Sequence, residues 1–311
     1  MAYLHVQLFG SVEATLGEGA SNLHFPTKKI KFLLCYLLLN RRVRHPRDRL
    51  ASLWWGDREA YKARHCLNTA IWRLRQVLEN QPSRPTHFLI IENDEIGFNI
   101  DSDYWLDVDE FERLCITART LDLSTDDSAG RILQRAVALY RDDLVPECYD
   151  EWCLIERERL QQLYLFALSR LVAYYTRRGE FMESITYCQR LLACDPLREE
   201  VHRDLIRLYL AVSCPQEALR QFKTCATVLK RELGVEPMAE TLALYRQIQL
   251  QGIPAGPPAT PASPAAAAIT SRELREVQAQ LSASGEHLIL AGVQLQQALY
   301  AVQQLLNRLN D

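Results

Sequence analysis

The sequence predicts a mainly α-helical protein that begins with an α+β winged helix-turn-helix, continues as an all-α tetratricopeptide (TPR)-like helical-repeat domain and ends in a coiled-coil helix. Three observations carry this prediction. Strand-like runs flank three helical segments near the N-terminus, helical periodicity then continues almost without interruption, and apolar residues finally recur every seven positions. The predicted division is a winged-helix domain at 1–105, the TPR-like domain at 106–251, a Pro/Ala-rich linker at 252–269 and the coiled-coil helix at 270–311.

Short strands and helices alternate in the first domain. Apolar positions alternate across Tyr3–Thr15 and are interrupted at Gly10, which predicts two short strands. Two helical segments follow, Lys28–Leu39 and then Asp48–Trp55, which ends at Gly56. After the third helix, two strand-like runs joined by an Asn-Asp turn predict a hairpin. This order is typical of a winged helix-turn-helix, whose third helix enters the major groove of DNA.

The third helical segment, Lys62–Glu79, carries two different faces. One face is apolar and suits a core, whereas the other has hydrogen-bond donors and acceptors, a threonine methyl and an aromatic ring, the groups that read base edges. An ordinary amphipathic surface helix would show the same pattern on this segment alone. The apolar face comprises Ala63, Leu67, Ala70, Ile71, Leu74 and Leu78, and the polar face comprises His65, Asn68, Thr69, Trp72, Arg73 and Gln76.

Positive charge is concentrated around this predicted recognition helix. Residues 25–84 contain 14 Lys and Arg against four acidic residues, a net charge of 14 − 4 = +10, although the whole chain carries −3. A local basic segment in a net-acidic protein indicates a surface that binds a polyanion. The predicted DNA-binding set is completed by the basic residues Lys62, Arg64 and Arg75, which are placed to meet phosphates, and by Arg44 and Arg47 before the second helix.

Residues 4–104 resemble a winged helix of the OmpR/PhoB type. The resemblance rests on the segment LASLWWG, which closes the second helix, on the I-x-x-L-R-x-x-L ending of the third helix, and on the final strand ending in Gly-Phe. It implies that Thr69 and Arg73 face bases and that His65, Asn68 and Trp72 flank them.

Two features depart from that pattern. The predicted hairpin carries Glu92, Asp94 and Glu95 where a wing usually tolerates or requires positive charge, and Trp72 is bulky for a position that faces DNA. The resemblance therefore supports groove reading by the third helix more than minor-groove reading by the hairpin.

The middle of the chain is helical almost throughout. Leu171, Tyr175 and Glu183 recur as Leu205, Tyr209 and Glu217 at a constant offset of 34 residues, which is the tetratricopeptide period. Stacked helix pairs of this kind commonly present a concave surface to a partner. The predicted helices are 107–121, 127–141, 151–177, 180–194, 198–211, 216–233 and 238–250.

This segment also resembles the bacterial transcriptional activator domain. The matching stretches are DEW (150–152), ERERL (156–160), CDPLREEVHRDLIRLY (194–209), EALRQF (217–222) and LKRELGVEPMAET (229–241). A winged helix followed directly by this domain is the architecture of the Streptomyces antibiotic regulatory protein family. The resemblance implies an activator that contacts RNA polymerase and lacks a phosphoacceptor receiver domain.

Charged and aromatic residues of the middle domain have structural readings as well as functional ones. The charged residues within 198–203 are interpreted mainly as a solvated helix face, with a polymerase- or interdomain-contacting cluster as the alternative. Trp152, Tyr174, Tyr175 and Tyr209 are predicted to be core residues rather than the lining of a ligand pocket.

The C-terminal segment has the pattern of a coiled coil. Gly252–Ala268 contains five prolines and no charge, as expected of a tether. Self-association of the helix beyond it is the favoured hypothesis, and packing back on the activator domain or binding another protein remain alternatives. The predicted interface positions are Leu274, Leu281, Leu288, Leu295, Val302 and Leu309.

The sequence as a whole favours a sequence-specific transcriptional activator that binds double-stranded promoter DNA as a homodimer and recruits RNA polymerase in the cytoplasm. A helical-repeat scaffold or sensor with a protein or small-molecule partner is the alternative. No P-loop, Gly-x-Ser-x-Gly or HExxH motif occurs, and the nine cysteines lack metal-ligand spacing. We therefore expect no enzyme, cofactor, metal site or membrane span.

Overall fold

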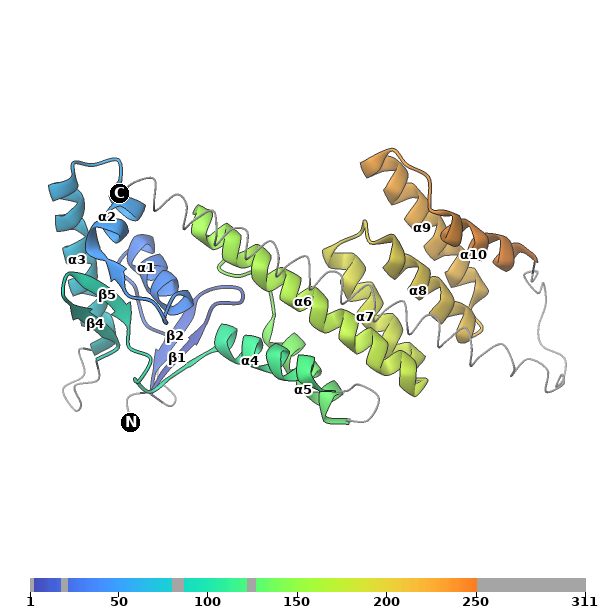
Figure 1. Cartoon of the computed structure of the whole chain (residues 1–311), viewed down its shortest axis with the longest axis horizontal. Helices are drawn as coiled ribbons and strands as arrows, with labels where there is room; N and C mark the ends of the chain where they lie inside the picture. Colours follow the sequence, from blue (N-terminus) through green and yellow to red (C-terminus); the bar gives the residue numbers. More distant parts are fainter. Residues whose placement is uncertain (1–2, 18–21, 80–86, 122–126, 251–311) are drawn as a thin grey trace. The chain divides into compact units, whose positions relative to one another are not determined.

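The computed structural model describes residues 3–17, 22–79, 87–121 and 127–250 (Figure 1). The predicted linker and the coiled-coil positions Leu274, Leu281, Leu288, Leu295, Val302 and Leu309 lie outside these ranges. The chain divides into two compact units, the first with residues up to 117 and 135–163, and the second with residues 118–134 and those from 164 onward. The division passes within three helices: α4 (Asp107–Thr120), α5 (Asp127–Leu139) and α6 (Glu151–Arg178).

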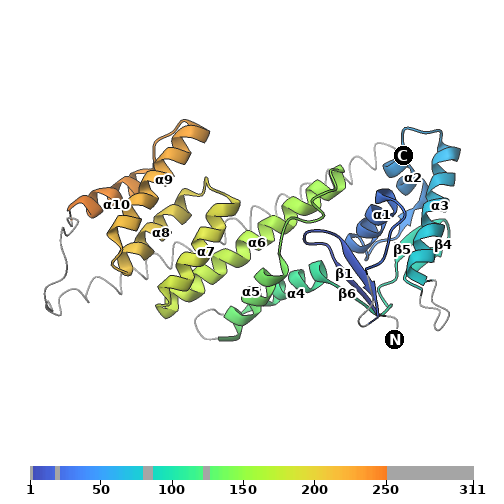
Figure 2. The same ribbon diagram turned by 180° about the vertical axis from the view of Figure 1, so that it is seen from behind.

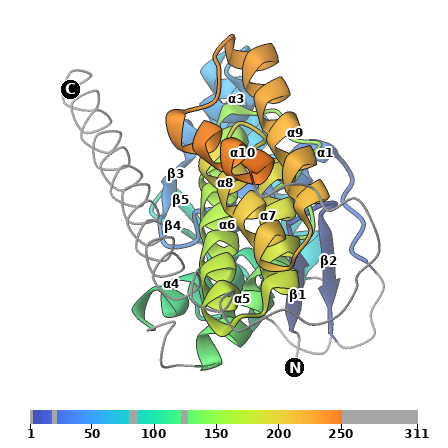
Figure 3. The ribbon, with the colours of Figure 1, turned by 90° about the vertical axis from the view of Figure 1, so that its right-hand side faces the viewer.

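The first unit contains two small sheets. In one, β1 (Leu4–Gln7) pairs antiparallel with β2 (Glu13–Leu16) and parallel with β6 (Tyr104–Leu106), as Figures 2 and 3 show. In the other, β5 (Glu95–Phe98) lies between β3 (His45–Pro46) and β4 (Leu89–Glu92). The hairpin was predicted, whereas β3 and β6 were not, because each is so short that its pairing depends on strands far away in the sequence.

The first unit also contains three helices, α1 (Lys28–Leu39), α2 (Arg47–Trp55) and α3 (Ala60–Glu79). Thr27 caps α1 by accepting a hydrogen bond from the backbone N–H of Ile30 at 3.3 Å. Pro46 immediately precedes α2 and belongs to β3. Strands and helices thus form the predicted winged helix.

The winged helix packs with the beginning of the helical region inside the first unit. The buried carboxylate of Asp107 accepts hydrogen bonds from the backbone N–H groups of Leu8 and Phe9, at 2.8 and 2.9 Å. Burial raises the pKa of Asp107 to about 6. The segment before α6 lies beside β1, since Val145 donates to the carbonyl of Leu8 at 2.9 Å.

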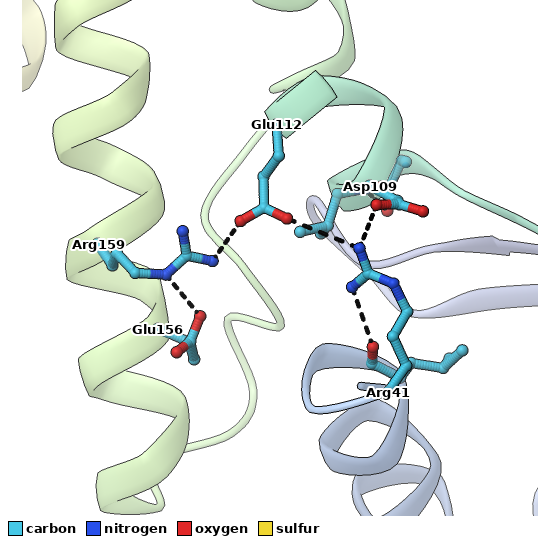
Figure 4. A network of polar contacts seen from close by, with 8 residues as sticks. Arg41, Asp109, Glu112, Glu156 and Arg159 are labelled. Carbon is cyan, nitrogen blue, oxygen red and sulfur yellow. Dashed lines mark hydrogen bonds and ion pairs between the residues drawn. The ribbon is translucent and has the colours of Figure 1, made fainter. Parts of the chain in front are cut away.

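An ion-pair network reinforces this packing (Figure 4). The guanidinium of Arg41, at the end of α1, pairs with Asp109 and lies 3.8 Å from Glu112, both on α4. Glu112 accepts from Arg159 of α6 at 2.6 Å, and Arg159 also pairs with Glu156 at 2.9 Å. The first unit therefore joins elements from both domains that the sequence suggested.

The second unit is helical and contains α7 (Phe181–Cys194), α8 (Glu199–Ala211), α9 (Pro215–Leu233) and α10 (Ala239–Leu250), which follow one another in Figure 1. Gly234 ends α9 in a left-handed conformation with φ of +71°. The core between α8, α9 and α10 contains Ile206, Ala218, Phe222 and Ile248, and the ring of Phe222 stacks on Tyr245 with centroids 4.3 Å apart. The predicted helix boundaries are accurate to within about two residues.

The interpretation of the 198–203 segment as a solvated face was wrong for two of its residues. Glu199 is buried and accepts hydrogen bonds from the backbone N–H of Met238 at 2.7 Å and the hydroxyl of Thr241 at 2.5 Å. His202 is buried between the carbonyl of Pro196 and the amide of Gln221. Both side chains anchor neighbouring segments to α8, and burial lowers the pKa of His202.

Candidate nucleic-acid interface

The helix α3 separates its two faces as the sequence predicts. Its buried residues are the six expected ones, from Ala63 to Leu78, and both Leu67 and Leu74 have no exposed surface. This apolar face packs on α1 and α2. The opposite face is consequently held outward by a rigid scaffold.

The predicted base-reading residues lie on that outward face. His65, Asn68, Trp72, Arg73 and Gln76 are exposed, with 61% of the Trp72 surface accessible, and Thr69 is half-buried. The hydroxyl of Thr69 donates to the carbonyl of His65 at 3.0 Å, which leaves its methyl group as the part available for contact. The face therefore offers two amides, a guanidinium and an aromatic ring for contact.

Two of the predicted phosphate-contacting residues pair with nearby carboxylates, one just before α3 and one at its end. Lys62 lies 3.0 Å from Glu59 in an exposed pair. Arg75 donates to Glu79 at 2.8 Å, and the other oxygen of Glu79 accepts from the backbone N–H groups of Phe88 and Leu89. Arg75 therefore helps to fix the start of the hairpin.

Three other predicted basic residues, Arg44, Arg47 and Arg64, pair with acidic residues elsewhere in the first unit. Arg44 lies 2.9 Å from Glu92, and Arg47 lies 3.3 Å from Asp94. Arg64 pairs with Asp94 and lies 2.9 Å from Asp48. The hairpin carboxylates, noted in the sequence as a departure from the usual wing, thus face the predicted phosphate-binding arginines.

A hollow of about 430 Å³ lies beside the exposed face of α3. Its walls include Lys29 and Thr27 from the start of α1, Trp55 from α2, and Thr69 and Arg73 from α3. The ammonium of Lys29 donates to the carbonyl of Trp54 at 2.7 Å and lies 5.3 Å from the centre of the Trp55 ring. Lys29 and Trp55 were not predicted to belong to this surface, although their place in the basic segment was a usable signal.

The described part of the chain provides no cluster of three or more His, Cys, Asp or Glu side chains that could hold a metal ion. Its nine cysteines are free thiols, most of them buried in helical cores. Burial raises the pKa of the Cys35 and Cys225 thiols, to about 12 for Cys225. No helix among the described residues is both long enough and apolar enough to cross a bilayer.

Comparison with known proteins gives three matches. Residues 106–249 match the family model of the bacterial transcriptional activator domain. The transcriptional regulatory protein MoaR1 of Mycobacterium tuberculosis is 24% identical over 237 residues, which cover 74% of this chain and 75% of the relative, and MoaR1 of Mycobacterium bovis gives the same values. Mycobacterium tuberculosis EmbR, solved in complex with a low-affinity phosphopeptide, matches with a TM-score of 0.68 at 18% identity, over 92% of this chain and 70% of that one.

These matches define a class of transcriptional regulators built on a bacterial transcriptional activator domain. Residues 106–249 of this chain match that domain, and the chain as a whole is similar to these transcriptional regulators. The likeness to EmbR confirms the predicted order of a winged helix followed by a helical domain.

Proposed function

We propose that this regulator is a sequence-specific activator that binds repeated promoter sites through α3 and recruits RNA polymerase. The observation that carries the proposal is the separation of the two faces of α3, with the apolar face fully buried and the polar face exposed. A helix held in this way can enter a major groove without rearranging the core. We also propose that the chain acts in the cytoplasm and catalyses no reaction, as its class suggests.

The polar face suggests a role for each side chain. The guanidinium of Arg73 can donate to guanine, and the amides of Asn68 and Gln76 can pair with the edges of other bases. Lys62 is exposed and pairs with an exposed glutamate, Glu59, so it is suited to a phosphate. Base reading is thus assigned to the middle of α3 and positioning to its first turn.

A mobility-shift titration tests these roles, with a duplex selected from a random pool by the wild-type protein and an unselected duplex. Arg73→Ala should weaken binding to the selected duplex by about 1–3 kcal/mol and leave the unselected duplex nearly unaffected. Lys62→Ala should weaken both duplexes alike and reduce the slope of affinity against salt by about one. Arg220→Ala, an exposed change in the second unit, serves as the control.

The outcomes separate the activator from a scaffold or sensor. Equal losses on both duplexes for Arg73→Ala would contradict base reading by α3. A wild-type protein that binds no duplex even at low salt would instead favour a helical-repeat protein whose winged helix contacts other proteins.

We further propose that the heptad segment, which lies outside the described residues, joins two copies of the chain. A flexible tether of 17 residues would reach on the order of 20–25 Å, enough to let two heads bind tandem sites in the same orientation. Deletion of residues 252–311 should then weaken binding to a two-site duplex and leave binding to a single site unchanged. Unchanged two-site affinity would refute this role.

A further inference from the structure

The turn between β4 and β5 is fixed beside the start of α2 and the outward face of α3. Asn93 and Asp94 both have left-handed backbones, with φ of 48° and 65°, as in a two-residue hairpin turn. The turn is anchored through its backbone, because the N–H of Arg47 donates to the carbonyl of Asp94 at 3.0 Å and Pro46 pairs with Glu95. The carboxylate of Asp94 is therefore held at a defined place on the proposed DNA-binding surface.

Asp94 engages two arginines at once. One carboxylate oxygen lies 3.3 Å from Nε of Arg47 and the other pairs with Arg64, while Asp94 itself remains 57% exposed. Glu92 pairs with Arg44 at 2.9 Å in the same way. A carboxylate and a phosphate compete for the same guanidinium N–H groups, because both are oxyanions recognised by the same donor fork. DNA phosphates would have to displace these carboxylates before the arginines could contribute fully.

Asp94 also acts on a predicted base-reading residue through Arg47. Nη1 of Arg47 donates to Oδ1 of Asn68 at 2.5 Å. Because arginine can only donate, the oxygen of the Asn68 amide must face Arg47, and its NH₂ group remains available as a donor. The chain of contacts from Asp94 through Arg47 to Asn68 therefore fixes the orientation of an amide that would face the groove.

We propose that Asp94 is a specificity-determining residue, which weakens binding to phosphates alone and orients Asn68 for base contact. The inference rests on the proposed function. At an unselected duplex, where phosphate contacts dominate, the paired arginines reduce affinity. At the preferred sequence, the oriented amide adds a contact that unselected DNA cannot match.

Asp94→Asn tests the proposal in the full-length chain. Asparagine is nearly isosteric and tolerates a left-handed backbone, so the turn should be retained while the negative charge is lost. Against an unselected duplex at about 50 mM salt, we expect an affinity gain of about three- to ten-fold and a salt slope steeper by about one. The ratio of affinities for selected and unselected duplexes should fall several-fold. Glu92→Gln should show a smaller gain in affinity, because it releases Arg44 alone.

The matched control is Asp101→Asn, which makes the same change in net charge at another exposed position of the first unit. Equal affinities and salt slopes for Asp94→Asn and Asp101→Asn would overturn the proposal, and so would weaker binding of Asp94→Asn to unselected DNA. If the wild-type chain binds no duplex, the proposed function fails as well, whereas failure of Asp94 alone leaves it intact. A thermal melt of each variant verifies that the fold is retained.

Discussion

The two units of the molecule use their ion pairs differently. In the first unit, Arg41 pairs with Asp109 and Arg64 with Asp94, residues that are far apart in the sequence. In the second unit, pairs such as Arg207 with Asp204 and Arg220 with Glu217 join neighbours on one turn of helix. A cation with a distant partner therefore cannot be recognised as paired from its own stretch of sequence.

This difference affects how much of the positive charge of residues 25–84 is available to a ligand. Lys28 and Lys31 pair with Glu147, and Arg41 pairs with Asp109 and Glu112, so part of the +10 charge of residues 25–84 is compensated within the first unit. The count of basic residues therefore overstates the potential available to a phosphate. Arg73, for which no ion pair is seen among the described residues, is a better candidate for ligand contact.

Loss of a long-range ion pair should reduce stability the most. Arg41→Ala should destabilise the first unit by about 3 kcal/mol, because Arg41 is buried and its loss removes the partner of Asp109 and one of the two guanidinium partners of Glu112. Urea unfolding followed by tryptophan fluorescence measures this, since all five tryptophans of the chain belong to the first unit. A loss below about 1 kcal/mol would mean that the network adds little to the packing.

The boundaries of the helices were predictable because local periodicity and capping residues determine them. Helix α3 is the best case: an apolar stripe in the sequence became a buried face, residue for residue. The wing was also recognisable, since an Asn-Asp turn between two apolar runs demands a left-handed backbone at both positions.

What the sequence could not provide was the set of partners across the fold. Asp94 was noted as an acidic residue in a wing, yet its contacts with Arg47 and Arg64 depend on how β5 lies beside β3. The burial of Glu199 similarly depends on the return of the chain at Met238 and Thr241. Local charge patterns indicate exposure only where the partner is local too.

Helix packing in the second unit provides the next prediction. Gly130 of α5 lies against Tyr174 of α6, and a Cβ at this position would come within 2.4 Å of the tyrosine ring. Gly130→Ala should therefore destabilise the second unit by about 1–3 kcal/mol, despite the better helix propensity of alanine. Far-UV circular dichroism should show the loss while tryptophan fluorescence changes little. Tyr174→Leu removes the clashing ring atoms. In that variant, Gly130→Ala should no longer be destabilising.

The stability of the second unit should also depend on pH. Burial raises the pKa of Asp204 from its ordinary 3.8 to about 7, and the nearby guanidinium of Arg207, 3.1 Å away, only partly offsets this. Because the folded state binds the proton more tightly, the stabilisation is complete below about pH 4 and is lost as pH rises through 7. Relative to Asp204→Asn, the wild-type protein should therefore lose stability steadily between about pH 4 and pH 7. The titration of His202 is common to both proteins and cancels in the difference between their free energies of unfolding. If that difference did not change with pH, the Asp204 carboxylate would lie in a better solvated site.

Loss of a local, exposed ion pair should change the free energy of unfolding the least. Arg220 and Glu217 are one helical turn apart, and 74% of the Arg220 side chain is exposed. Arg220→Ala should change the free energy of unfolding by less than about 0.5 kcal/mol, because water and salt screen such a pair. The melting temperatures measured by circular dichroism at low and at high salt should differ by the same amount in the variant and in the wild type. A loss as large as that of Arg41→Ala would mean that sequence separation does not distinguish the pairs that stabilise this fold.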